Sequence, residues 1–506
     1  MNNMECIITI ELGTNAVRIF ALDLNGVVIG SMKGYYPTFY SQPDYSEQDP
    51  EQIFITMLYV LKNLLNEKIH PKRYKVASIC FSSYMHSLLT VDKNGVPIGN
   101  AITWADNRAK KEAREIRESE LADAMYNNTG TPLHPMSPLL KIAWLRKNDP
   151  NKFSRAGKFL SIKSYVLHQL TGEYVIDYSL ACATGMLNIH KIAWEQIALD
   201  YAGITADQLP QLVPVFASAG NLKKAYQNSL GLSDDTKILT GSSDGCMATL
   251  GAGIWNSDKA TITIEDSGAV RVVGNKMLHD EKKRVFNYLI TENCFVSGGP
   301  SNSGGGIFEW FAKQFGDFPN AYDIDSSMNA LFEEAVKVNT GSEGLLFLPY
   351  LLGERAPIWN PDARGMYFGI NIKHEKQHFI RATIEGVIYE IYSIGKMLKE
   401  HRNIKELSIN GSFATNPFCS QMIADMFNEP VHVPKNANSV SFGAFLLAAT
   451  EMGIFKSLDE AAGQIEIGKT YMPMENQHRT YMKYFDIFER LSHKLGDEFA
   501  QIAELQ

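Results

Sequence analysis

Ile8-Thr9-Ile10-Glu11-Leu12-Gly13-Thr14-Asn15-Ala16-Val17-Arg18 is the stretch from which the fold can be predicted. Its first residues are rich in β-branched side chains, its centre has turn chemistry, and a second β-type run follows from Ala16 to Phe20. Asn25-Gly26 then marks a further hairpin turn. The pattern predicts a β-hairpin followed closely by a third strand.

A second copy of this pattern begins at Ile262. The words ITIE and AVR recur there in the same order, about half of the 506-residue chain beyond Ile8, in Ile262-Thr263-Ile264-Glu265, Asp266-Ser267-Gly268 and Ala269-Val270-Arg271. Two words in register favour an internal duplication. Two unrelated hairpins of similar composition are the alternative on this evidence alone.

Helical and strand patterns alternate in the rest of the chain. We expect helices over residues 50–69, from 245 onward, over 376–401, after Asn416 and over 439–450, and strands over 76–81, 237–240, 407–409 and 431–434. Such alternation predicts the α/β class, with sheets flanked by helices. We place the boundary near residues 245–258, which gives an N-terminal lobe of residues 1–250 and a C-terminal lobe of residues 251–506.

Composition narrows the classes of function. A net charge of -8 argues against general affinity for nucleic acid or anionic membranes. We find neither a signal peptide nor an apolar run of the ~18 residues that a membrane helix needs. The six cysteines are widely spaced and form no CxxC pair, so we expect packed, reduced thiols and a cytoplasmic protein. With nucleic acid and membranes disfavoured, we expect the partner to be a small-molecule substrate.

The Gly13-Thr14 turn has the chemistry of a phosphate site. Backbone N–H groups and a hydroxyl lie side by side there, and a facing copy in the second half would hold a triphosphate from both sides. Glu11, at the end of the preceding strand, would bind Mg²⁺ directly or through water. A Gly-Thr turn alone is weak evidence, because most such turns bind no phosphate. The sequence contains neither of two other nucleotide-binding motifs, GxxxxGK[ST] and GxGxxG.

Gly241-Ser242-Ser243-Asp244-Gly245 supports two rival interpretations. It fits GxSxG between a strand and a helix, which would make Ser243 the nucleophile of a serine hydrolase, with His374, His378 and His432 as downstream histidines. In a kinase the important residue is instead Asp244, which would accept the proton of the substrate hydroxyl. An Asp in such a turn also serves commonly as a helix cap.

Longer motifs resemble the FGGY family of carbohydrate kinases, whose fold has two actin-like (ribonuclease H-like) lobes. They cover Met136–Asn148, Gly365–Ile370 with His378-Phe379 and Ala382–Glu385, Gly241–Gly245, and Asn410–Asn416. Within the family, the segments Tyr84–Ser87, Ile102–Arg108, Thr129–Met136 and Gly353–Trp359 are similar to those of gluconate kinases, and xylulose kinases share part of this pattern. The resemblance implies an ATP- and Mg²⁺-dependent kinase for gluconate, or alternatively for a xylulose-type ketose, and is compatible with a homodimer.

The resemblance also assigns roles to residues. Asp244 is the expected catalytic base, Glu11 and Asp244 are the expected metal ligands, and substrate hydroxyls are expected to meet His86, Trp104, Asp106 and Asn107. The nucleotide is expected to contact Gly13, Thr14, Asn15, Arg18, Ser267, Gly268, Gly305, Glu309, Gly411, Ser412 and Asn416. Arg108 could meet a substrate carboxylate, but an ordinary surface arginine is the commoner case, and we leave Arg108 out of the expected site.

The second turn departs from the family's pattern. Glu265-Asp266-Ser267 stands where Gly-Thr-Ser is usual. A carboxylate about 4 Å from a phosphate oxygen would be repelled by about 4 kcal/mol at an effective dielectric constant of 20, equivalent to roughly a thousandfold in rate. Three outcomes are open: the acids point away, an extra Mg²⁺ bridges them, or the chain is a degenerate kinase that binds a sugar or nucleotide without efficient turnover.

Overall fold

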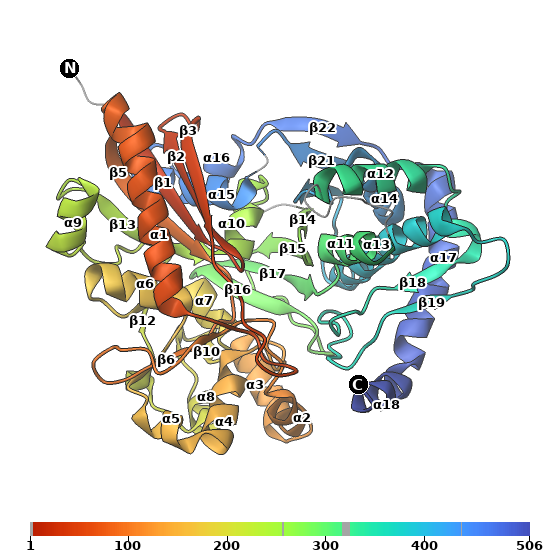
Figure 1. The fold of residues 1–506 in the computed structure, drawn as a ribbon, viewed down its shortest axis with the longest axis horizontal. Coiled ribbons are helices and arrows are strands. Elements are labelled where there is room, and N and C mark those ends of the chain that lie inside the picture. The colour runs from red at the N-terminus through yellow and green to blue at the C-terminus, as the bar shows by residue number, and fades with distance from the viewer. Residues whose placement is uncertain (1–3, 256–257, 316–323, 437) are drawn as a thin grey trace. The chain divides into compact units, whose positions relative to one another are not determined.

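The computed structural model describes residues 4–255, 258–315, 324–436 and 438–506. They form two compact units, and Figure 1 shows the ribbon with most of its elements labelled. The first unit contains Met1–Trp255, Gly274–Val296 and Asn438–Gln464, and the second contains Asn256–Val273, Ser297–Ala437 and Ile465–Gln506. Two segments from the second half of the sequence therefore belong to the first unit.

The first unit is built on a five-stranded sheet. Its strands, in spatial order, are β13 (Lys237–Ser243), β5 (Lys75–Ser83), β1 (Glu5–Leu12), β2 (Ala16–Asp23) and β3 (Val28–Tyr35). The predicted hairpin is confirmed, because β1 pairs with β2 in antiparallel register, with Glu11 opposite Arg18. β1, β5 and β13 are mutually parallel.

The sheet of the second unit repeats this arrangement. Its strands include, in spatial order, β21 (Val431–Pro434), β20 (Glu406–Asn410), β14 (Lys259–Ile264), β15 (Gly268–Gly274) and β17 (Cys294–Ser301), and β22 (Ile467–Tyr471) lies beyond β21. As in the first sheet, β14 pairs with its hairpin partner β15 in antiparallel register and with β20 in parallel. The ITIE–AVR repeat thus marks equivalent places in two sheets of the same strand order, as an internal duplication requires.

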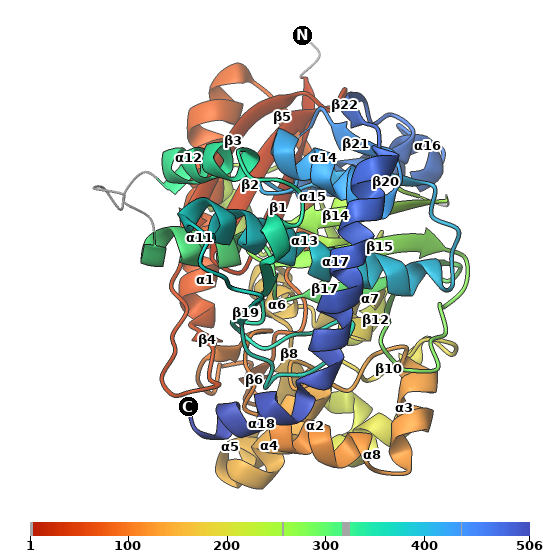
Figure 2. The ribbon, with the colours of Figure 1, turned by 90° about the vertical axis from the view of Figure 1, so that its right-hand side faces the viewer.

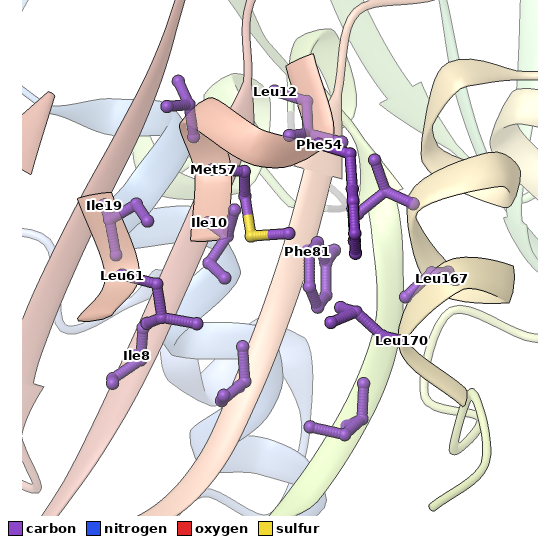
Figure 3. Close-up of a cluster of buried hydrophobic side chains, with 14 of the residues drawn as sticks. Ile8, Ile10, Leu12, Ile19, Phe54, Met57, Leu61, Phe81, Leu167 and Leu170 are labelled. Carbon is purple, nitrogen blue, oxygen red and sulfur yellow. The ribbon is translucent and has the colours of Figure 1, made fainter. Parts of the chain in front are cut away.

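Helix α1 (Pro50–Leu64) covers one face of the first sheet. The Asp49 carboxylate caps it by accepting from the amides of Glu51 and Gln52 at 2.9 and 3.3 Å, as Asp-Pro before an apolar periodic run predicts. Figure 3 shows the packed cluster, in which α1 and α6 (Ile162–Thr171) meet the strands through Phe54, Met57, Leu61, Leu167, Leu170, Ile8, Ile10 and Phe81. Burying each such side chain stabilises the fold by about 1.5–3 kcal/mol.

Two helices meet on the sheet through their backbones. α10 (Asp244–Gly251) packs on α15 (Ser439–Glu451), and α15 also contacts β1, β5 and β13 (Figure 1). A side chain could not fit between the helices: a Cβ on Gly251 would lie 1.9 Å from the Ser439 carbonyl oxygen, and one on Gly443 would lie 2.0 Å from that of Met247. These glycines let α15, from the end of the chain, close the apolar side of a sheet formed at its beginning.

The helices of the second unit surround α13 (Lys376–Lys399). α13 packs against α14 (Pro417–Phe427) and the long α17 (Glu475–Lys494), which lies along α14 and leads into α18 (Gly496–Glu504), as Figure 2 shows. The predicted strand at 407–409 and the helices at 376–401, after Asn416 and at 439–450 are all present within a few residues of their expected ends.

Two expectations about chain chemistry can also be compared with the structure. All six cysteines are buried and, in the described part of the chain that contains them, none forms a disulfide. Among the described residues, no helix combines the length and apolar character needed to span a bilayer.

Candidate active site

The carboxyl ends of three parallel strands define the candidate site of the first unit. The pairing places Leu12 of β1 level with Ser83 of β5, and Ser83 level with Ser243 of β13. Glu11 and the Gly13–Asn15 turn, His86, and Asp244 therefore follow neighbouring strands at one sheet edge. In open α/β sheets, this edge is where ligands bind. The sequence nominated residues that are up to 233 positions apart, and the sheet brings them to one place.

The first turn is held in shape from the interior. The Gly13 amide donates to the Ala16 carbonyl oxygen at 3.0 Å, and the Tyr36 hydroxyl donates to the Gly13 carbonyl oxygen at 2.5 Å. Gln48 Nε2 donates to the Thr14 carbonyl oxygen at 2.5 Å, and Trp104 Nε1 donates to Thr14 Oγ1 at 3.0 Å. Both turn carbonyls are thereby tied inward, while Asn15 at the tip is exposed.

Trp104 consequently links the predicted substrate segment to the predicted phosphate turn. It is partly buried against the core, and its indole N–H already donates a hydrogen bond to Thr14 in the turn. Tyr36 and Gln48 were not nominated from sequence, and an isolated Tyr or Gln gives no signal that could have found them.

Glu11 has the donor chemistry of a metal ligand. Its side chain is 11% exposed, and its Oε1 accepts from Arg18 Nη1 at 2.8 Å. Carboxylate oxygens are ligands that Mg²⁺ prefers, and Asp244 offers a second carboxylate two strands away, about 10 Å at about 4.8 Å per strand spacing. Both side chains offer oxygen ligands for a divalent cation, and their sharing of one cation stays a prediction. Arg18 would compete with the metal for Glu11, and it also offers a cation near phosphate.

Asp244 begins α10, and Ser243 caps that helix. The Ser243 hydroxyl accepts from the Cys246 amide at 3.4 Å, and the residue is fully buried. The Asp244 carboxylate accepts from the Gly245 amide at 2.7 Å and is partly exposed. A hydrolase nucleophile must be open to its substrate, so the buried Ser243 argues against the serine hydrolase interpretation. Asp244 has the exposure that a general base needs.

His86 has the uncommon backbone geometry found at functional sites. Its φ is +64°, its ring Nδ1 lies 2.7 Å from the Ala183 carbonyl oxygen, and its ring packs 5.2 Å from that of Phe286. Its own carbonyl oxygen accepts from Lys141 Nζ at 2.8 Å. The side chain is thus anchored at one ring nitrogen, and the backbone at its carbonyl.

Lys141 joins two predicted substrate segments. Its ammonium group is fully buried and donates to the carbonyl oxygens of His86 and Thr103 at 2.8 and 2.7 Å. Burial lowers the pKa of Lys141 to about 7, although Asp106 opposes this shift. The sequence carries a signal for this role, because the lysine interrupts the apolar run of α4 (Pro138–Asn148).

Replacing Lys141 with Met tests this role. The neutral amine has two N–H donors for the two carbonyls, so deprotonation keeps both bonds and removes a buried charge. The unfolded chain binds more protons between pH 7 and pH 10.5, and the stability of the wild-type protein should therefore rise through that window. We expect the stability difference between wild type and Lys141→Met to grow from pH 7 to pH 9, by at most about 1.4 kcal/mol per pH unit.

Urea unfolding at pH 7, 8 and 9 measures this difference. Lys93→Met, at an exposed loop position, is the control. A constant difference across the three pH values would contradict the prediction.

Asp106 is engaged by the protein rather than open to solvent. Its Oδ1 accepts from the Arg108 amide and Nε at 3.1 and 2.8 Å, and its Oδ2 accepts from the Ser46 amide and Arg108 Nη2 at 2.7 and 2.8 Å. These four donors fill the acceptor sites of a carboxylate. Direct binding of a sugar hydroxyl by Asp106 stays a prediction, and it would require one of these bonds to rearrange. Asn107, next in sequence, is half-buried.

The expectation that Arg108 is an ordinary surface residue is wrong. Its side chain is 6% exposed, pairs with Glu47 at 2.6 Å, and stacks 3.7 Å from the ring centroid of Tyr45. Burial alone lowers the pKa of Arg108, but the hydrogen bonds and charges of Asp106 and Glu47 outweigh it and raise that pKa. Arg108 and Asp106 therefore form one structural unit with Glu47.

The second turn is clamped by the start of α11 (Gly305–Phe315). The amides of Gly305 and Gly306 donate to the carbonyl oxygens of Glu265 and Asp266 at 2.7 and 3.1 Å. Both acidic side chains are exposed, and Ser412 Oγ donates to Glu265 Oε2 at 3.4 Å. Glu265 thus points toward Ser412, a residue expected to contact the nucleotide, rather than away from it.

The other residues expected to contact the nucleotide lie at the start of β15, in α11, and between β20 and α14. Gly268 and Gly411 have no room for a side chain: a Cβ would lie 2.8 Å from the Ser303 carbonyl oxygen and 2.3 Å from that of Ile264, respectively. Ser267 is half-buried beside them. Glu309 pairs with Lys313 at 2.5 Å along α11, and Asn416 Oδ1 caps α14 by accepting from the Phe418 amide at 2.9 Å. Their nucleotide contacts stay predictions.

Comparison with known proteins agrees with this geometry. The model of the FGGY carbohydrate kinase N-terminal domain matches residues 6–251, and that of the C-terminal domain matches residues 260–452. The chain belongs to the FGGY family of carbohydrate kinases. It is accordingly a phosphotransferase, and the two-lobed actin-like fold expected from the sequence is confirmed.

Individual relatives match the FGGY chain over nearly its whole length. A gluconokinase of Bacillus subtilis is 37% identical over 98% of this chain and 97% of the relative. A xylulose kinase of Staphylococcus epidermidis is 30% identical over 96% of each chain. The crystal structure of a gluconate kinase from Lactobacillus acidophilus superposes with a TM-score of 0.92 at 32% identity, covering 99% of this chain and 100% of that one. FGGY kinases use ATP with a divalent metal.

Proposed function

We propose that this FGGY kinase transfers the γ-phosphoryl group of ATP to gluconate, giving 6-phosphogluconate and ADP. The observation that carries the proposal is the convergence of Glu11, the Gly13–Asn15 turn, His86 and Asp244 at one carboxyl edge of the first sheet. The 37% identical gluconokinase supports gluconate as the substrate. The lobe of residues 1–250 would bind the sugar acid and that of residues 251–506 the nucleotide.

In this mechanism the chain supplies a general base, side chains that orient the sugar, and a turn that binds phosphate. Asp244 accepts the proton of the substrate hydroxyl as the oxygen bonds to phosphorus. His86 and Trp104 orient the sugar, and the amides of Thr14 and Asn15 donate to phosphate oxygens. Mg²⁺, held through Glu11 and Asp244, would neutralise phosphate charge. The buried cysteines are compatible with a reducing compartment, and we propose the cytoplasm.

A xylulose-type ketose is the second candidate. The 30% identical xylulose kinase motivates it, and a ligand-bound xylulose kinase structure from Lactobacillus acidophilus also superposes with a TM-score of 0.92. A panel of gluconate, other sugar acids, xylulose and glycerol, read out by ADP formation, separates the candidates. We expect the highest kcat/KM for gluconate, whereas a higher value for xylulose would overturn that choice.

The same panel tests catalysis itself. If no compound yields ADP above background while calorimetry detects sugar or nucleotide binding, the chain is a degenerate kinase, as the acids at 265 and 266 would allow. The homodimer compatible with the family resemblance is checked by light scattering on the same preparation.

A further inference from the structure

A buried ionic cluster contacts the two residues that precede Asp244 in the sequence. Lys163 Nζ, in α6, lies 2.7 Å from Asp177 Oδ2, and these side chains are 1% and 0% exposed. Asp177 closes β9 (Val175–Asp177) and caps α7 (Tyr178–Ala183), where its Oδ1 accepts from the amides of Ser179 and Leu180 at 3.1 and 3.2 Å. Burying two charges is costly unless they are paired and hydrogen-bonded, and both conditions are met here.

The cluster reaches the end of β13 through Ser179. The Ser179 hydroxyl lies 2.5 Å from Asp177 Oδ1 and 2.7 Å from Ser242 Oγ, and it accepts from the Ser243 amide at 2.9 Å. Lys163 Nζ also donates to the Ser242 carbonyl oxygen at 3.1 Å. Three contacts thus fix the two residues that immediately precede Asp244.

The backbone just before Ser242 departs from regular strand geometry. Gly241 has a φ of +63°, and the β5–β13 pairing is irregular between Leu239 and Ser242. The register of β13 against β5 therefore shifts a few residues before Asp244. Interrupted pairing beside an active site typically re-aims a side chain, and the cluster adds side-chain restraints at Ser242 and Ser243, where the pairing with β5 resumes.

We propose that Lys163, Asp177 and Ser179 are positioning residues that hold the Ser242–Ser243 backbone and thereby orient the Asp244 carboxylate toward the substrate hydroxyl. The proposal rests on the proposed kinase function for its kinetic consequence. None of the three residues needs to touch substrate. A displacement of about 1 Å at a reacting group can cost about 100-fold in rate, so loosening this backbone should lower kcat.

Ser179→Ala is the sharpest test, because it removes the bridging hydroxyl and nothing else. Using the substrate chosen by the panel, we expect kcat to fall by about 10- to 100-fold with KM for sugar and ATP unchanged. Ser179→Thr, which retains a hydroxyl, should recover much of the rate. Asp177→Asn should act in the same direction as Ser179→Ala. The control is Ser78→Ala, another fully buried serine, on the adjoining strand β5, whose hydroxyl has no partner in the described structure.

A second measurement is independent of the substrate. Hydrogen exchange of the amides at residues 242–245 should be faster in Ser179→Ala than in wild type or Ser78→Ala. Wild-type kcat together with unchanged exchange would overturn the positioning role, and so would a loss confined to KM. If the wild-type protein phosphorylates nothing, the proposed function fails, and the exchange result alone decides whether the cluster holds this backbone.

Discussion

Asp244→Asn is expected to lower kcat by about 10²- to 10⁴-fold, the range that a positioned general base contributes. The amide has the shape of the carboxylate but cannot accept the hydroxyl proton. It can still accept the hydrogen bond from the Gly245 amide, so α10 and its Ser243 cap should remain intact. Steady-state kinetics with ADP detection give the rate, and calorimetry should show that the sugar still binds.

The matched control for this substitution is Asp49→Asn. Asp49 also stands at the beginning of a helix in the first unit, and an asparagine there can accept the same capping bonds from Glu51 and Gln52. We expect its kcat to equal that of the wild-type protein. An Asp244→Asn variant that keeps more than about a tenth of the activity would exclude Asp244 as the general base, given the range above.

Replacing the second-turn acids is expected to increase kcat/KM for ATP. The double variant Glu265→Gly, Asp266→Thr restores the residues usual in the family. A carboxylate about 4 Å from a phosphate oxygen costs about 1 kcal/mol in water and about 4 kcal/mol at an effective dielectric constant of 20, which predicts a gain between about 5-fold and roughly a thousandfold. Both acids are exposed, so solvent screening favours the lower end.

Charge can be separated from shape in this experiment. Glu265→Gln with Asp266→Asn removes both charges and retains the side-chain volumes, so it should show most of the gain. Added salt should also bring the wild-type protein closer to this variant. A lower kcat/KM in the amide variant would mean that the acids help to bind a cation, the second of the outcomes left open by the sequence.

The sequence predicts those parts of the fold that depend on neighbouring residues. The turns after Glu11 and Glu265, the cap at Asp49 and the helix after Asn416 each follow from a few adjacent side chains, and the structure has all of them. Propensity and capping act over one or two turns of chain, which is why such boundaries can be read locally.

The sequence does not predict the partners of the site residues. Nothing near Asp106 indicates that Ser46 and Arg108 fill its acceptor sites, and nothing near Thr14 indicates Gln48. The contacts of Ser46 with Asp106 and of Gln48 with Thr14 join residues that are far apart in the sequence. The error over Arg108 has the same origin: an arginine in a polar segment is usually exposed, and its burial here depends on the distant ring of Trp144 as well as on Tyr45.

The placement of α15 constrains how the protein is made. The helix that packs on α10 and on the strands of the first sheet comes from residues 439–451, long after the sheet itself has been synthesised. During translation, the nascent first unit must therefore expose that apolar face until most of the chain has left the ribosome. A chain terminated near residue 250 would expose it permanently, so the N-terminal half should aggregate when expressed alone, whereas co-expression of the missing half could restore a closed core.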